Sequence, residues 1–293
     1  MTAQLKKIIP FANPPFLTLA ASGYFFGAGV ARYLGRADSP LNLWLGLVWV
    51  LLLVLAMNLL TAYFRPPNEP LLEDETLKER NWLRAAFFQI SLGLLGVVAL
   101  LTLSLLISGI TALSLVLALL ILFAAMAYAL PPARLVTSGF GELLLSVLFA
   151  LLIPAFALSL QIGEIHRLLV ALAFPLLAIL FAFFLLMDFP AYATDRKYER
   201  GSLLLRIGWE RAVPLHHILI LTAYLLFAAM PLFDLPRALF MPLFYAAPFA
   251  FVQIYWLQKI TQGVPPNWRF LRFLAYSVIG LTLYILIFTL WTR

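Results

Sequence analysis

Nine long apolar stretches constrain the fold of this chain more than any other feature of its sequence. They lie near residues 15–34, 41–64, 82–106, 109–130, 141–161, 167–188, 212–232, 236–258 and 270–291. A helix needs about 20 mostly apolar residues to cross a bilayer, because its backbone polar groups find no water there. The sequence therefore predicts an all-α integral membrane protein with nine transmembrane helices, forming a single transmembrane domain over residues 1–293.

The composition agrees with a membrane protein and excludes several classes of site. Of the 293 residues, 64% are hydrophobic and 11% are charged, whereas about a quarter of an ordinary soluble domain is charged. The chain has no cysteine, which excludes disulfides, thiolate nucleophiles and cysteine-bound metals. The first apolar stretch lacks an evident cleavage site of small residues, so we expect a first helix that is retained.

The basic residues predict how the chain is oriented in the membrane. With a cytoplasmic N-terminus, only Arg32, Arg36, Arg167, Arg237 and Arg293 of the 20 Lys and Arg residues fall on the opposite side. Cytoplasmic segments carry the excess of Lys and Arg, so we expect an inside N-terminus and an outside C-terminus, in a prokaryotic inner membrane. The net charge of +7 then reflects topology and contact with membrane lipids, and not nucleic-acid binding, because the basic residues form no dense cluster.

Polar residues concentrate in two segments on the predicted cytoplasmic side. Residues 65–81 carry three prolines and an acidic group formed by Glu69, Glu73, Asp74, Glu75 and Glu79. Residues 189–211 carry Asp195, Lys197 and Arg200 among other charged residues. We therefore predict that these two segments are cytoplasmic loops that cover a pocket.

Three patterns in the sequence resemble the motifs of a known family. They are Tyr128, Pro131-Pro132 and Gly139-Phe140-Gly141-Glu142; Asp195-Arg196-Lys197 with Arg200, Ser202-Leu203 and Arg206-Ile207-Gly208; and, more weakly, Asn58 to Phe64. In this order and spacing the chain resembles the UbiA superfamily of intramembrane prenyltransferases, particularly its dihydroxynaphthoate polyprenyltransferase branch. The resemblance implies nine helices around a central apolar cavity.

The resemblance also implies a chemistry for which this sequence lacks residues. In the family, two sets of aspartates hold magnesium on a prenyl diphosphate, whose departure leaves an allylic cation for an acceptor to capture. Magnesium requires hard oxygen ligands. Where the motifs have aspartates, this chain has Ala62, Arg65 and Ala191. We therefore expect no metal site and no certain cofactor, with magnesium chemistry that is lost or altered.

Helical spacing predicts which side chains face the pocket. Asn58, Ala62 and Arg65 share one helix face, and Asp188, Ala191 or Tyr192, and Asp195 share another, with Pro190 able to break the second helix. The predicted catalytic residues are Asp188 and Asp195, and the predicted substrate-binding residues are Asn58, Arg65, Tyr192, Lys197 and Arg200. We expect Arg65 to form a salt bridge with Asp188 or Asp195; the alternative is that Arg65 anchors the helix end among lipid headgroups.

Other polar residues favour structural interpretations. Glu142 begins a predicted helix, where a negative charge stabilises the positive helix end. His216 and His217 point to different helix faces and lack a third ligand, so we interpret them as interfacial residues, not as a proton carrier or metal site. The acidic residues of 65–81 form a solvated loop more readily than a set of replacement metal ligands. Gly23 and Gly27 predict close helix packing.

Three functions remain open at the level of sequence. The first is a catalytically silent relative that binds an isoprenoid or quinone-type lipid, as an accessory subunit of a membrane complex. The second is an active prenyltransferase in which Arg65, Lys197 and Arg200 hold the diphosphate of the substrate directly. The third is a transporter or scaffold that shares only the fold.

Overall fold

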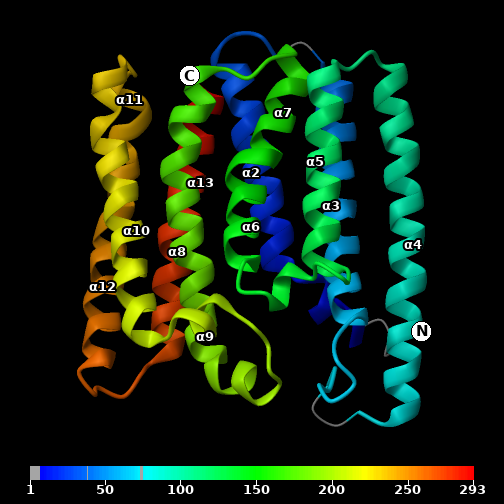
Figure 1. Cartoon of the computed structure of the whole chain (residues 1–293). Helices are drawn as coiled ribbons and strands as arrows, with labels where there is room; N and C mark the ends of the chain where they lie inside the picture. Colours follow the sequence, from blue (N-terminus) through cyan, green and yellow to red (C-terminus); the bar gives the residue numbers. More distant parts are fainter. Residues whose placement is uncertain (1–6, 38, 73–74) are drawn as a thin grey trace.

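The chain forms a bundle of long helices (Figure 1). The computed structural model describes residues 7–37, 39–72 and 75–293. Lys6 of the predicted cytoplasmic side, and Glu73 and Asp74 of the acidic segment, lie outside the described residues. In chain order the elements are η1 (Ile9–Ala12), α2 (Pro14–Tyr33), α3 (Pro40–Tyr63), α4 (Leu77–Ile107), α5 (Ala112–Ala129), η2 (Leu135–Thr137), α6 (Gly141–Val147), η3 (Leu148–Leu152), α7 (Ile153–Ile162), α8 (Arg167–Lys197), α9 (Leu203–Ile207), α10 (Trp209–Ala229), η4 (Met230–Phe233), α11 (Arg237–Phe240), η5 (Met241–Ala246), α12 (Ala247–Thr261) and α13 (Trp268–Thr292).

The prediction of an all-helical membrane protein is confirmed. Within the described residues, eight helical segments are long and apolar enough to cross a membrane: α3, α4, α5, α6 through α7, α8, α10 through η4, α11 through α12, and α13. The remaining predicted span is α2, which runs beside the others in Figure 1. Its two prolines and three glycines lower its hydropathy, so the count of nine stays a prediction that depends on α2.

Side-chain caps fix where several of these helices begin. The Thr76 side chain accepts a hydrogen bond from the Glu79 backbone, and Glu79 reciprocates in a capping box at the start of α4. Ser39, Thr111 and Asn267 cap α3, α5 and α13 in the same sense. Such caps satisfy backbone N–H groups that have no partner inside the helix.

The predicted packing glycines lie where two helices touch. A Cβ atom added to Gly23 would overlap the Phe149 carbonyl oxygen, and one added to Gly27 would overlap the Pro154 carbonyl oxygen. Small residues let helix backbones approach closely in a bilayer, where apolar surface gives no preference for protein over lipid. This contact holds α2 against η3 and α7, near the centre of the bundle.

The prediction of a loop over residues 189–211 is wrong for most of its length. Helix α8 continues unbroken through Pro190 to Lys197, and α9 and the start of α10 follow after a short turn. Prolines persist inside bundle helices because packing from neighbouring helices maintains the helix around the missing hydrogen bond; α8 packs on α6, α10 and α13. The other predicted loop, 65–81, ends earlier than expected because α4 begins at Leu77.

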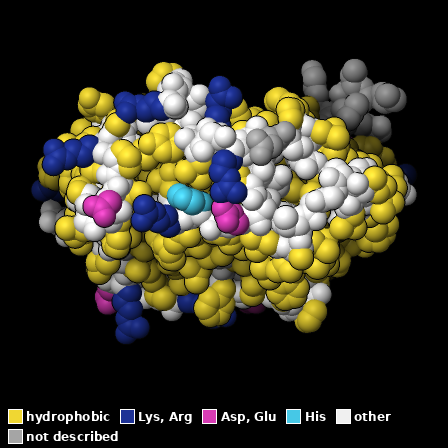
Figure 2. All heavy atoms as spheres, turned by 90° about the horizontal axis from the view of Figure 1, so that it is seen from above, with side chains coloured by type: hydrophobic (Ala, Val, Ile, Leu, Met, Phe, Trp, Pro, Cys, Tyr) yellow, Lys and Arg dark blue, Asp and Glu magenta, His cyan; other side chains and the backbone are white. Residues whose placement is uncertain are grey.

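The two ends of the bundle differ in their connections. One end, here called the site end, carries residues 64–72, residues 130–140 and α9, which lie at the bottom of Figure 1. The opposite end has short turns and a surface ion pair between Arg36 and Glu164 at 2.6 Å. Figure 2 views that opposite end, where charged side chains lie among hydrophobic ones. The longer connections, with their polar and charged side chains, lie at the site end.

Candidate functional site

A cavity of about 280 Å³ lies at the site end, among α2, α3, α6 and α8. Its ionisable lining residues are Arg65, Glu69, Tyr128, Arg134, Glu142, Asp188, Asp195, Arg200 and Tyr276. Its aromatic and apolar lining includes Phe16, Phe183, Phe184 and Met187. The cavity thus combines charges of both signs with an apolar interior, which is typical of sites that bind amphipathic ligands.

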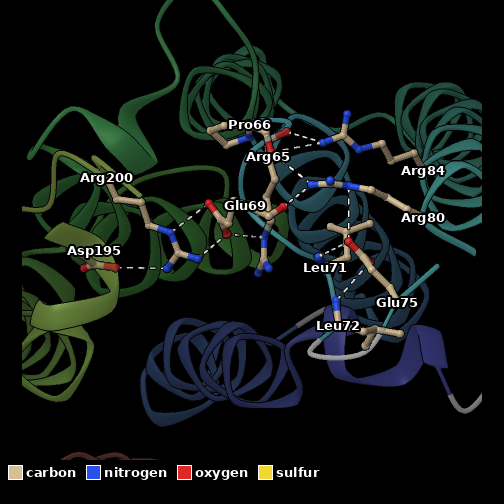
Figure 3. A network of polar contacts seen from close by, with 10 residues as sticks. All are labelled: Arg65, Pro66, Glu69, Leu71, Leu72, Glu75, Arg80, Arg84, Asp195 and Arg200. Atoms are coloured by element: carbon tan, nitrogen blue, oxygen red, sulfur yellow. Dashed lines mark hydrogen bonds and ion pairs between the residues drawn. The ribbon is translucent and has the colours of Figure 1, made fainter. Parts of the chain in front are cut away.

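One side of the cavity, here called the arginine wall, consists of Arg65, Arg134, Arg200 and the carboxylate of Glu69. Arg200 donates through Nε to Glu69 Oε2 at 3.1 Å, donates through Nη2 to Glu69 Oε1, and donates through Nη1 to Asp195 Oδ1 at 3.1 Å. Arg65 Nε lies 3.3 Å from Glu69 Oε1. Figure 3 shows Glu69 between the two guanidinium groups.

Burial and neighbouring charges shift the pKa values of the arginines on this wall. Burial lowers the pKa of Arg65; the charge of Glu69 opposes that effect, and Arg200 and Arg134 add to it. Burial also lowers the pKa of Arg134. Although burial opposes it, hydrogen bonds and charge from Glu69 and Asp195 raise the pKa of Arg200. Arginine keeps its charge throughout, so three guanidinium groups beside the two carboxylates of Glu69 and Asp195 leave one positive charge for a further anion.

Arginines of α4 hold residues 64–72 in place behind the wall. Arg84 Nη2 donates to the Arg65 carbonyl oxygen at 2.6 Å, and Arg80 donates to the Glu69 carbonyl oxygen. Glu75 accepts from the backbone N–H groups of Leu71 and Leu72 at 3.0 and 3.2 Å and pairs with Arg80 (Figure 3). These contacts hold the segment that presents Arg65 and Glu69, so the arginine wall is fixed from outside the cavity.

The second side of the cavity, here called the carboxyl wall, consists of Glu142 on α6 and Asp188 on α8. Glu142 is 8% exposed and accepts from the Leu203 backbone N–H through Oε1 at 2.9 Å. Its second oxygen, Oε2, and Asp188 Oδ2 are buried and accept no hydrogen bond from another described group, while the Glu142 and Asp188 side chains lie within hydrogen-bond reach of each other. No described arginine forms an ion pair with either carboxyl group.

The structure brings together most of the residues that the sequence predicted for the site. Asp188, Ala191 and Asp195 share a face of α8 and all line the cavity, as do Arg65 and Arg200. This settles the alternative between Ala191 and Tyr192 in favour of Ala191, because Tyr192 packs against Trp209 outside the cavity.

Two other predicted binding residues lie elsewhere. Lys197 is exposed and stands over the Tyr198 ring, not in the cavity. Asn58 is buried, donates through Nδ2 to the Ala12 carbonyl oxygen at 2.8 Å, and lines a smaller neighbouring cavity of about 120 Å³. Asn58 therefore anchors the chain that precedes α2.

The predicted salt bridge from Arg65 to Asp188 or Asp195 is wrong. Arg65 pairs with Glu69, four residues later in the turn that leaves α3, and Asp195 pairs with Arg200. The physical reason is local: Glu69 lies within reach of Arg65 and needs positive partners because only 3% of its side chain is exposed. The alternative of headgroup anchoring is wrong as well, since Arg65 lines the cavity.

The cavity does not fit magnesium. Among the described residues, no group of three His, Asp or Glu side chains is arranged to hold a metal ion. Glu69 and Asp195 are engaged by Arg200, and alanines occupy positions 62 and 191. Magnesium demands an octahedral set of oxygen ligands, and the guanidinium group of Arg200 beside Glu69 and Asp195 disfavours a divalent cation there.

The sequence did not predict roles in the cavity for Glu69, Arg134, Tyr128 and Glu142. Glu142 was interpreted as a helix-end charge and Glu69 as part of a solvated loop, yet both are buried. The available signal was position: Tyr128 and Glu142 flank the turn that contains Arg134, and that turn carries part of the resemblance described above.

The interpretation of His216 as an interfacial residue is also wrong. His216 is fully buried in α10, and its Nε2 lies 2.7 Å from Gln253 Nε2 of α12. A hydrogen bond between these side chains requires one acceptor. It is supplied either by His216 Nε2, in the tautomer that leaves this nitrogen unprotonated, or by the Gln253 amide oxygen, if the amide is turned round. The contact joins two helices away from the cavity and adds nothing to its lining.

An apolar groove lies next to the cavity. It has a volume of about 770 Å³ between α2 and α13, and it shares Pro15 and Tyr276 with the lining of the cavity. The rest of its lining is largely apolar, including Leu19, Ile279 and Leu283. A polar cavity that adjoins a lipid-facing apolar groove can hold a head group and a hydrocarbon chain together.

No family model and no curated protein sequence matches this chain significantly. Solved structures match along nearly its whole length. A digeranylgeranylglyceryl phosphate synthase matches with a TM-score of 0.62 and 16% identity, over 99% of this chain and 100% of that chain. A UbiA homologue from Archaeoglobus fulgidus matches when bound to Cd²⁺ (TM-score 0.55, 16% identity) and to GPP and Mg²⁺ (0.53, 14%), in both cases over 96% of this chain and 99% of that chain.

These matches confirm the expected fold. The chain has the fold of the UbiA intramembrane prenyltransferases, and it does so with most of each chain aligned. At 14–16% identity the likeness establishes architecture alone, and the dihydroxynaphthoate polyprenyltransferase branch remains a prediction.

Proposed function

We propose that this protein binds an isoprenoid lipid with an anionic head group, for which a prenyl diphosphate is the best fit. The observation that carries the proposal is the arginine wall: Arg65, Arg134 and Arg200 line one cavity, and two carboxylates, Glu69 and Asp195, pair with arginines there. Guanidinium groups bind phosphate oxygens in a bidentate manner and keep their charge when partly buried. They therefore replace the metal as the partner of the diphosphate.

The apolar groove supplies the site for the hydrocarbon chain of the ligand. Because Pro15 and Tyr276 line both the groove and the cavity, a chain attached to a head group at the arginine wall can continue between α2 and α13. Two prenyl diphosphates, GPP and DMAPP, are bound in solved structures of this fold. The head group thus lies at the site end, which we propose to be cytoplasmic because most Lys and Arg residues belong there.

Binding of GPP by the purified protein in lipid nanodiscs tests this proposal. We expect affinity in EDTA to match affinity in Mg²⁺ within about twofold, because arginines and not metal hold the head group. Arg134→Gln removes a cation whose Nε has no described partner, so it leaves no acid unpaired, and we expect roughly tenfold weaker binding. The exposed Arg196 provides the matched control, Arg196→Gln. Binding that requires Mg²⁺, or that Arg134→Gln leaves unchanged, contradicts the proposal.

A second candidate function is prenyl transfer at the same site. The carboxyl wall supports it, since binding of an anionic head group does not require two carboxyl groups without an arginine partner in the same cavity. In this function the arginine wall stabilises the departing diphosphate. Incubation with GPP and an aromatic acceptor, with and without Mg²⁺, followed by mass spectrometry of the extract, distinguishes the two: a prenylated acceptor establishes transfer. Its absence, with GPP binding intact, favours a lipid-binding role as an accessory subunit of a membrane complex.

A further inference from the structure

A groove of about 640 Å³ lies at the end of the bundle opposite the site end. It is formed by α8 and α10, which pack side by side (Figure 1), and by the turn that follows η4. Val170, Phe174 and Leu226 give it an apolar lining, and all three side chains are exposed within spanning segments. The groove shares no lining residue with the cavity, so it is a separate feature of the molecule.

Two opposite charges lie at one end of this apolar lining. Arg167 is the first residue of α8, and Asp234 directly follows η4, so both stand where a spanning segment reaches the same boundary of the bilayer. Both are exposed and line the groove. Among the described residues, neither forms an ion pair with the other or with a third residue. Both charges are therefore available to a ligand.

The arrangement is complementary to an amphiphile whose head group carries charges of both signs. A guanidinium group binds phosphate oxygens in a bidentate manner, and a carboxylate accepts charge-assisted hydrogen bonds from an ammonium group. A purely anionic head group at Arg167 would be repelled by Asp234, and a purely cationic one at Asp234 would be repelled by Arg167. The apolar lining, which continues from these charges along the spans, accepts a hydrocarbon chain.

The carboxylate of Asp234 also distinguishes between zwitterionic head groups. A carboxylate only accepts hydrogen bonds, and a primary ammonium group has N–H groups to donate to it. A trimethylated ammonium group has none, and its methyl groups keep the positive charge farther from the carboxylate oxygens. The charges at the groove therefore favour a head group with a primary ammonium group.

We propose that this groove is a binding site for a zwitterionic phospholipid with a primary ammonium group, as in a phosphatidylethanolamine. Its phosphate pairs with Arg167, its ammonium group donates to Asp234, and one acyl chain lies between α8 and α10 against Phe174 and Leu226. The lipid is a structural ligand of the opposite end of the bundle. The site is independent of the function proposed for the cavity.

Two lipids that differ only in the substituents of the head-group nitrogen test this proposal: dioleoylphosphatidylethanolamine and dioleoylphosphatidylcholine. Native mass spectrometry of the protein in detergent, with each lipid titrated, measures the affinity for the first bound lipid. We expect the wild-type protein to bind the ethanolamine lipid roughly fivefold more tightly, as a charge-assisted hydrogen bond at an exposed position provides.

Variants of the two charged residues assign the preference to the groove. Asp234 has a φ of 56°, which asparagine tolerates, so Asp234→Asn is expected to fold and to lower the preference to within about twofold. Arg167→Gln is expected to weaken both lipids alike by roughly threefold and to keep the preference, because both carry the phosphate. The exposed Arg237, which does not line the groove, provides the control Arg237→Gln, which should change neither affinity.

Photo-crosslinking locates the bound lipid in the wild-type protein. An ethanolamine lipid with a diazirine in one acyl chain is expected to label residues 167–175 and 226–235, which contain the groove lining. Labelling confined to other segments overturns the proposal. Equal affinity of the wild type for the two lipids overturns it as well, and so does a preference that Asp234→Asn keeps. Tighter binding of dioleoylphosphatidylglycerol than of the ethanolamine lipid also overturns it, because that result identifies a site for anions alone.

Discussion

The two walls of the cavity differ in whether their carboxyl groups are paired with arginines. On the arginine wall, Glu69 is paired with two guanidinium groups, and Asp195 with one. On the carboxyl wall, Glu142 and Asp188 have no described arginine partner, and their side chains lie within hydrogen-bond reach of each other. A paired charge stabilises the folded chain as long as its partner is present, whereas a carboxyl group without a cationic partner can interact with a bound ligand. Substitutions on the two walls are therefore expected to change different properties.

The largest expected effect is on the stability of the arginine wall. Arg200→Ala leaves the buried carboxylates of Glu69 and Asp195 short of a positive partner. Breaking a buried ion pair from one side costs about 3–5 kcal/mol, so we expect the free energy of unfolding to fall by that order. Unfolding by SDS titration in mixed micelles measures it. Arg196→Ala, an exposed change on the same helix, is the control, and an equal effect of both variants contradicts the pairing.

A substitution on α8 converts the cavity into a metal site. Ala191 lines the cavity one helical turn after Asp188, and Asp188 lies close to Glu142, so Ala191→Asp brings a third carboxylate to two that no described arginine engages, as hard divalent cations require. At a Mg²⁺ concentration of 100 times its dissociation constant, we expect stabilisation of about 2.7 kcal/mol. Thermal unfolding with and without Mg²⁺ measures this. The exposed neighbouring change Ala193→Asp should show no Mg²⁺ effect, and a response of the wild type would refute the absence of a metal site.

The smallest expected effect comes from removing the carboxylate at the centre of the arginine wall. Glu69→Gln keeps the shape of the side chain but leaves Arg65 and Arg200 without its charge. We expect inorganic diphosphate to bind roughly tenfold more tightly, about 1.4 kcal/mol, because it no longer competes with an internal anion. Isothermal titration calorimetry measures the change, with the exposed Glu199→Gln as control. Weaker binding would mean that Glu69 orients the arginines and does not compete.

The fold could be predicted from the sequence because the hydrocarbon core of a bilayer requires each spanning helix to be a long apolar stretch. Helix bounds such as 41–64 follow from apolar length, and they agree with α3 (Pro40–Tyr63). The course of α8 was not accessible in the same way. Pro190 and the charged residues after it are typical of a loop, but packing on α6, α10 and α13 continues the helix to Lys197.

Part of the site could be predicted from the sequence, and the rest could not because it depends on contacts between distant segments. Helical spacing correctly grouped Asp188 and Asp195 on one face. Pairing across the cavity depends on how residues 64–72 fold back, which Arg80 and Arg84 determine from a different helix. No local pattern in the sequence encodes that contact, so Glu69 was predicted to be solvated although it is 2% exposed.

The groove between α2 and α13 determines which measure of ligand concentration controls the occupancy of the site. Its lining is mostly apolar and adjoins the cavity at Pro15 and Tyr276, so a long-chain ligand exchanges with the lipid phase directly. Occupancy then depends on the mole fraction of ligand in the bilayer, not on its concentration in the surrounding water. Diluting the ligand with added lipid at constant total ligand should empty the site, whereas diluting the whole vesicle suspension with buffer should leave occupancy unchanged.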